Sequence, residues 1–276
     1  MAVIDESPKS TPNEDMSLPV PRRLQLAAGV LGTEVRHEVR LLKHDPVPLA
    51  TVVVLPFVFL IFGAPAYNHL AGVRNGTSFL LPGVSVMFAF LLVPFAGFSL
   101  FREHGWQTWR RIRSLVSSPG TVLLGKLVPW LFIAVIQLLL VPAIAAVVLG
   151  FDTRGSWTAY TLVAVATAVC VCGLTFLAYA ISSSVYALNA VGNVGAIIFG
   201  GLGGALAPLQ KLPGWVQAIA HVVPTYWAIR GLRDVCIGGA GLLAVLPACA
   251  VLVLFAAAAA VIGVWRLDVS AEKRSW

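Results

Sequence analysis

The segment FREHGWQTWRRIRSLVSSPGTVLLGK, residues Phe101–Lys126, lies between two long apolar runs. It carries four arginines and one lysine against a single acid, Glu103. Trp106, Trp109 and Ile112 recur every three residues, so on a helix they share one side. A basic, aromatic, amphipathic segment between two spans predicts contact with the membrane surface or with a cytosolic partner. We interpret it as a lever moved by such a partner. The alternative is a basic loop that only sets topology.

The composition places the chain in a membrane. Of the 276 residues, 58% are hydrophobic and 11% are charged, whereas a soluble domain has roughly 25% charged residues. The mean hydropathy is +0.87. The net charge of +7 follows from basic cytosolic loops and does not require a nucleic-acid partner. The four cysteines form no C-x-x-C pair, so we expect buried thiols and neither a disulfide framework nor a metal site.

Six apolar runs are long enough to cross a bilayer, which takes about 20 helical residues. These runs contain no charged residue, and they are Leu49–Tyr67, Phe79–Phe101, Leu127–Leu149, Ala159–Ile181, Val185–Leu206 and Leu242–Trp265. Prolines within the runs predict kinks. The link Ser182–Ser184 is very short, so the fourth and fifth spans are expected to form a tight antiparallel hairpin.

The predicted organisation has four parts. Residues 1–21 are polar and proline-rich and predict a disordered cytosolic tail. Residues 22–45 predict an amphipathic helix that is too charged to span and lies on the inner membrane face. Residues 46–267 form the six-span domain, and residues 268–276 form a cytosolic tail. With the N-terminus inside, the inner segments hold 14 Lys and Arg residues and the outer segments 5, which places both termini in the cytosol.

The outer connection Ala207–Ala240 differs from the other loops because it is long and largely apolar. Its pattern predicts two short helices that enter or lie on the outer leaflet, and the alternative is a plain interfacial anchor. The residues that mark this outer re-entrant segment are Pro213, Trp215, Pro224, Tyr226 and Arg233. Before it, Gly200 and Gly204 have the GxxxG spacing, which favours close helix packing or the lining of a path.

Several chemistries are excluded by what the segments lack. Gly120–Leu127 nearly forms a phosphate-binding P-loop, but Leu127 stands where Ser or Thr would hold magnesium. The chain is therefore not expected to hydrolyse ATP. The spans contain no Asp, Glu, Lys, Arg or His, which argues against an ion-coupled carrier and against a membrane hydrolase. A permease driven by another protein is the simplest interpretation.

Four stretches carry a resemblance to a known family. They are Phe79–Gly83, the E-x-G…T-x-x-R pattern within Arg102–Arg111, Pro119 with Gly125-Lys126, and Gly203–Arg233. Their order and spacing are similar to those of the ABC-2 type transporter permeases, which are the membrane subunits of bacterial ABC exporters. The daunorubicin-resistance-like branch is the most similar. The likeness extends from about Glu34 to Trp265.

The resemblance implies an all-α membrane protein with six transmembrane helices, an N-terminal interfacial helix, a cytosolic coupling helix after span two and re-entrant helices between spans five and six. It implies two permeases, identical or paralogous, around a central path, in contact with membrane lipids. ATP and Mg²⁺ would be bound by a separate ABC ATP-binding subunit, and this chain would need no cofactor. The positions that match the coupling element are Glu103, Gly105, Trp106, Thr108, Trp109, Arg110 and Arg111.

The expected function is outward transport of an apolar or amphipathic substrate, a drug or a lipid, across the bacterial plasma membrane. The chain itself is then no enzyme, and Gly200 and Gly204 are candidates for lining the path. One alternative is export of a lipid-linked polysaccharide by the same architecture. Another is a membrane scaffold or assembly protein that needs no ATPase partner.

Overall fold

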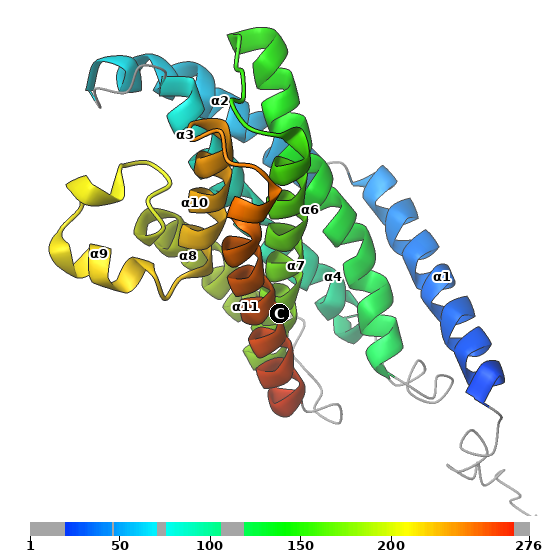
Figure 1. The fold of residues 1–276 in the computed structure, drawn as a ribbon. Helices are drawn as coiled ribbons and strands as arrows, with labels where there is room; N and C mark the ends of the chain where they lie inside the picture. The colour runs from blue at the N-terminus through cyan, green and yellow to red at the C-terminus, as the bar shows by residue number, and fades with distance from the viewer. Residues whose placement is uncertain (1–19, 46, 71–75, 106–118, 268–276) are drawn as a thin grey trace, which may run out of the picture.

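The computed structural model describes residues 20–45, 47–70, 76–105 and 119–267, and in these ranges the regular elements are helices (Figure 1). Six stretches are long and apolar enough to cross a membrane: Ala50–Tyr67, Gly76–Arg102, Val122–Leu149, Trp157–Ile181, Val185–Leu202 and Leu242–Arg266. The predicted all-α, six-span fold is thus confirmed. The predicted tails lie almost entirely outside the described residues.

The second crossing forms the centre of the bundle and consists of two helices, α3 (Gly76–Phe90) and α4 (Leu92–Gly105). The helix breaks at Leu91 because Pro94 has no N–H to donate to the carbonyl of Phe90. The apolar stretch of this crossing is 83% buried, against 22% for the first and fifth crossings. Its neighbours approach very closely, since a Cβ atom at Gly83 would lie 2.0 Å from the carbonyl oxygen of Ala205.

The third crossing helix begins earlier than its apolar run. Helix α6 spans Pro119–Leu149, so its first turns include the stretch Gly120–Leu127. The stretch that resembles a P-loop is therefore helical, in agreement with its interpretation as the start of a membrane helix. The amphipathic helix α1 (Val20–His44) packs lengthwise against α6 (Figure 1). Gly125 permits this approach, because a Cβ there would lie 2.7 Å from Cβ of Glu34. Whether α1 also lies on the membrane face stays a prediction.

The fourth crossing, α7 (Trp157–Ile181), packs along the last, α11 (Leu242–Arg266). Small residues make the contact close: a Cβ at Gly173 would lie 2.8 Å from the carbonyl oxygen of Ala256. Helix α8 (Val185–Leu202) packs mainly against α4 and α3. The short link Ser182–Ser184 is confirmed, but the tight hairpin is wrong, because the small-residue face of α7 is occupied by α11.

The fifth crossing ends four residues before its predicted limit, at Leu202. Glycines follow, and Gly204 has φ +77°, a conformation that side-chain-bearing residues rarely adopt. The chain continues through η2 (Leu209–Lys211), α9 (Gly214–Ala220) and α10 (Pro224–Cys236). The two predicted short helices are therefore present. Helix α9 projects from the bundle, whereas α10 packs into it against α3, α7 and α11 (Figure 1).

The bundle has two distinct ends. The start of α1, the start of α6 and the end of α11 lie together at the lower end in Figure 1, which we call the inner end. At the opposite, outer end, the link between α6 and α7 contacts the link between α10 and α11, where the Arg154 N–H donates to the Cys236 carbonyl at 3.3 Å. Because the start of α1 and the end of α11 lie at the same end, the chain crosses the bundle an even number of times. The cytosolic placement of the inner end stays a prediction.

Candidate functional site

The predicted coupling element is only partly within the described residues. Glu103 and Gly105 belong to the last turn of α4. Trp106, Thr108, Trp109, Arg110 and Arg111 lie outside the described residues. Just before them, Arg102 is half-buried, and its guanidinium carbon lies 5.6 Å from the centre of the Phe98 ring. The role of these residues in coupling stays a prediction.

A buried group of charged and polar side chains joins α1 to the first turns of α6. The Lys126 Nζ lies 3.9 Å from Oε2 of Glu34 and 3.8 Å from Oε2 of Glu38. The Trp130 indole N–H donates to Oε1 of Glu38 at 3.2 Å. The side chains of Lys126 and Glu38 are each 1% exposed. We call these four residues the inner charge cluster.

The sequence builds this cluster by helical spacing. Glu34 and Glu38 are four apart on α1, and Lys126 and Trp130 are four apart on α6, so each pair lies on one face of its helix. The predicted runs contain no charged residue, but the crossing stretches of the structure extend beyond them: Val122–Leu149 includes Lys126, and two others end at Arg102 and Arg266. The sequence prediction places Lys126 in the preceding loop. The two matching intervals of four were a signal that could have revealed this contact.

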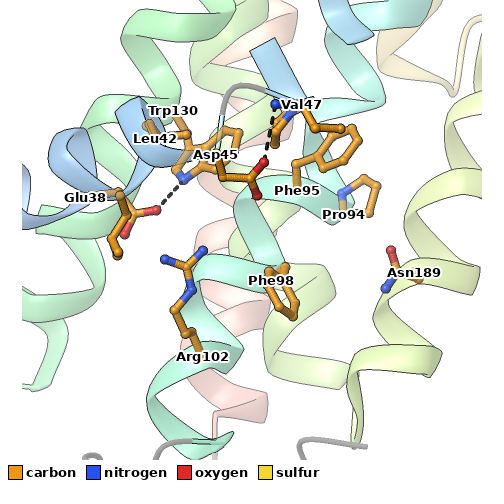
Figure 2. Close-up of a pocket in the computed structure, with 12 residues that line it drawn as sticks. Glu38, Leu42, Asp45, Val47, Pro94, Phe95, Phe98, Arg102, Trp130 and Asn189 are labelled. Atoms are coloured by element: carbon orange, nitrogen blue, oxygen red, sulfur yellow. Dashed lines mark hydrogen bonds between the residues drawn. The ribbon is translucent and has the colours of Figure 1, made fainter. Parts of the chain in front are cut away.

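A pocket of about 260 Å³ opens beside the cluster, between α1, the start of α2 (Val47–Leu70), α4, α6 and α8 (Figure 2). Its polar lining comes from Glu38, Asp45, Arg102 and Asn189. The Asp45 carboxylate also accepts the Val47 N–H at 3.3 Å and so caps the start of α2. The Asn189 amide donates to the Val185 carbonyl at 3.1 Å.

Aromatic rings form much of the remaining wall of this inner pocket. Phe95 and Phe98 come from α4, one turn apart, and Trp130 comes from α6. Pro94, where α4 lacks a backbone donor, lines the same wall. The pocket thus combines opposite charges with apolar rings at the inner end. Sequence reasoning did not find it, because its residues come from four parts of the chain that are far apart: 38–48, 94–102, Trp130 and Asn189.

A second polar group fixes the outer end. The Arg233 guanidinium lies over the Phe79 ring, with Cζ 3.9 Å from the ring centre. Its Nε donates to the Phe79 carbonyl at 3.2 Å, and its Nη2 donates to the Ala205 carbonyl at 3.2 Å. The Tyr67 hydroxyl donates to the Leu206 carbonyl, and the Tyr67 ring stacks on Phe79. Burial lowers the pKa of Arg233 to about 10, so the side chain stays charged near neutral pH.

Arg233 lies on a short outer helix, α10, as the sequence predicts, and it links α10 to α3 and to the segment after α8. The other marked residues of the outer segment differ in burial: Pro213 and Trp215 are exposed, Tyr226 is half-buried and Pro224 is buried. Pro213 precedes α9, Trp215 is 64% exposed, and Pro224 begins α10. The Tyr226 ring is half-buried, 5.4 Å from that of Trp227. Their re-entry into the outer leaflet stays a prediction.

The two candidate path glycines have different positions. Gly200 is buried on α8, and a Cβ there would lie 2.9 Å from Cγ of Met87 on α3. Gly204 lies beyond the end of α8. The GxxxG spacing therefore does not form one helix face. Packing within the chain accounts for Gly200, and lining of a path stays a prediction.

Comparison with known proteins gives two matches. The family model described as "ABC-2 type transporter" matches residues 31–237. The chain is also similar to the "Daunorubicin resistance ABC transporter permease protein DrrB1" of Streptomyces coeruleorubidus, with 26% identity over 215 residues that cover 72% of each chain.

Proposed function

The chain belongs to the ABC-2 type transporter family, since the family model covers more than half of it, and from this premise we propose that it is the permease of a drug or lipid exporter. The match over residues 31–237 is the observation that carries this proposal, because it includes five of the six crossings and both short outer helices. The similarity to a drug-resistance permease supports an amphipathic cargo.

In this proposal a separate subunit hydrolyses the ATP. The stretch Gly120–Leu127 forms helical turns, and a Cβ at Gly125 would already meet Glu34, so this segment offers no loop to cradle a phosphate. Nucleotide binding then has to come from another chain. The segment after α4 is the expected contact with that chain, because it follows the most buried crossing and connects it to α6.

Replacing Trp109 and Arg110 together with alanine is expected to reduce co-purification of the ATP-binding subunit about tenfold or more. Tryptophan and arginine are the residues whose truncation most often weakens a protein interface, by about 2 kcal/mol or more each. The measurement is the amount of ATPase recovered with the tagged permease from membranes. The matched control is Trp215→Ala with Arg230→Ala at the outer end, where both side chains are exposed. Equal recovery of the ATPase with both double variants would contradict the proposal that this segment transmits movement from the ATPase.

The exposed side of α8 supports a second copy of this chain in the exporter. Asn193 and Gly201 are exposed on the same side of this crossing helix, and a Cβ at Gly201 would meet nothing within 4 Å. Lipid tails cannot hydrogen-bond an amide, and small residues are typical of helix–helix contacts in membranes. This side is therefore better suited to another α8, or to a polar path between two copies, than to lipid.

A cysteine at position 193 is expected to cross-link two copies in the membrane. Asn193→Cys, made in a background without the four native free cysteines, should give a covalent dimer on oxidation. Denaturing gel electrophoresis without reductant measures the dimer fraction. The control is Leu254→Cys on α11, whose native side chain is 68% exposed. If position 193 yields no more dimer than position 254, two copies do not meet along α8.

A further inference from the structure

We propose that one side of α1 binds the headgroups of anionic phospholipids at the inner end of the bundle. This side, which we call the basic face, consists of Arg36, Arg40 and Lys43, and all three side chains are exposed. The lipid would be a partner separate from the transported substrate, because the basic face contains none of the predicted coupling or path residues.

The charges of α1 are separated onto opposite sides of the helix. Successive residues of an α-helix are rotated by about 100°, so the three cations share one side, and Glu34 and Glu38 lie about 180° from them. The two acids face α6, where the Lys126 Nζ lies 3.9 Å from Glu34 and 3.8 Å from Glu38. The cations of the basic face pair with no carboxylate of the described residues. An anionic surface is therefore complementary to this face.

The packing of α1 holds the basic face at the level of the lipid headgroups. The acids on its other side meet Lys126, which lies near the start of the crossing stretch Val122–Leu149. The first crossing begins at Ala50, only seven residues after Lys43, which is about 10 Å of helix. The headgroup region adds about 5–8 Å on each side of the hydrocarbon core. Arginine and lysine side chains are long enough to reach it.

The composition of the basic face suits phosphate groups. A guanidinium donates two parallel N–H bonds to phosphate oxygens, and an ammonium adds a compact positive charge. Val39, which is 40% exposed beside the cations, offers an apolar side chain to the boundary of the acyl chains. An acidic protein surface would match the same charges. Lipid is favoured because α1 packs lengthwise along a crossing helix, which keeps it at the membrane.

The test is native mass spectrometry of the full chain in a neutral detergent, with equal amounts of phosphatidylglycerol and phosphatidylcholine. The chain is expected to retain phosphatidylglycerol about fivefold more often, which is the factor that one basic residue contributes at an anionic surface. Replacing Arg36, Arg40 and Lys43 together with glutamine should reduce this preference to equal binding. Because the three side chains are exposed, the melting temperature of this variant should match that of the parent protein.

Two further variants separate the basic face from net charge. The matched control replaces three exposed cations near the outer end, Arg154, Lys211 and Arg230, with glutamine and should keep the preference. Arg36→Lys with Arg40→Lys retains the charge of the basic face and should also keep it.

Three results would overturn the proposal. An unchanged preference in the inner triple variant would show that the basic face does not bind lipid. Equal losses in the inner and outer triple variants would show that net charge alone attracts the lipid. Lower recovery of the ATP-binding subunit with an unchanged lipid preference would assign the basic face to a protein partner. The lipid measurement involves neither ATP nor substrate, so its failure leaves the exporter proposal standing.

Discussion

Lys126→Met is expected to destabilise the protein by about 3 kcal/mol and to loosen α1 from α6. The substitution removes the cation that lies within 4 Å of both Glu34 and Glu38 and leaves Glu38 buried without it. Breaking a buried ion pair on one side typically costs about 3–5 kcal/mol, and the long N–O distances here favour the lower value. For a chain of this size the melting temperature should fall by about 6–12 °C.

Loosening of α1 can be measured separately from thermal stability, by proteolysis. Arg36 and Arg40 are exposed on α1, so trypsin should cut there faster in the variant than in the parent protein. The double variant Glu38→Gln with Lys126→Met removes the stranded carboxylate as well, and it should recover much of the lost stability, because Glu34 is 21% exposed and can reach water. A single variant that melts and is cut like the parent would show that the cluster does not hold α1.

At the outer end, Arg233→Ala is expected to lower the free energy of unfolding by a similar amount, about 3 kcal/mol. It removes two hydrogen bonds from a charged donor and the contact with the Phe79 ring, and it leaves the Ala205 carbonyl without its guanidinium partner. Arg233→Lys should lower the free energy of unfolding by about half as much, since an ammonium keeps the charge but cannot reproduce the planar set of guanidinium N–H donors.

The control for Arg233 lies on the same helix. Arg230 is 53% exposed, and its Nε lies 3.8 Å from a carboxylate oxygen of Asp234, so Arg230→Ala should change stability by less than about 1 kcal/mol. Thermal unfolding in detergent compares the three variants with the parent protein. Equal losses from Arg230→Ala and Arg233→Ala would contradict the role of Arg233 as the link between α10 and α3.

Hydropathy and turn residues were enough to predict the elements of this fold. A segment that crosses a bilayer must be apolar along its whole length, so the six crossings could be read from the sequence. Pro213 and Pro224 marked the starts of α9 and α10, because proline is tolerated in the first turn of a helix. The Ser182–Ser184 link was found as the short gap between two apolar runs, and in the structure the Ser184 side chain caps α8.

The contacts between elements were harder to predict, because hydropathy reports transfer of a segment to lipid and not which side chains meet inside the protein. Lys126 was assigned to a basic loop and Arg233 to an outer helix, yet Lys126 is buried, Arg233 is half-buried, and both make specific contacts within the bundle. The pairing of α7 with α11 depends on Gly173 and Gly263, whose small size matters only once the partner helix is known. The inner pocket could not be predicted either, because its lining residues meet only once the helices are packed.

The account depends on energy supplied by a second protein, and purification of the intact complex from native membranes tests this dependence. The tagged full-length chain would be isolated in mild detergent, and mass spectrometry would identify its partners and their ratio. We predict an ATP-binding-cassette protein in an equimolar amount, together with ATP hydrolysis that Trp109→Ala with Arg110→Ala abolishes from the purified sample. Recovery of this chain without any nucleotide-hydrolysing partner would contradict the account and favour a membrane scaffold.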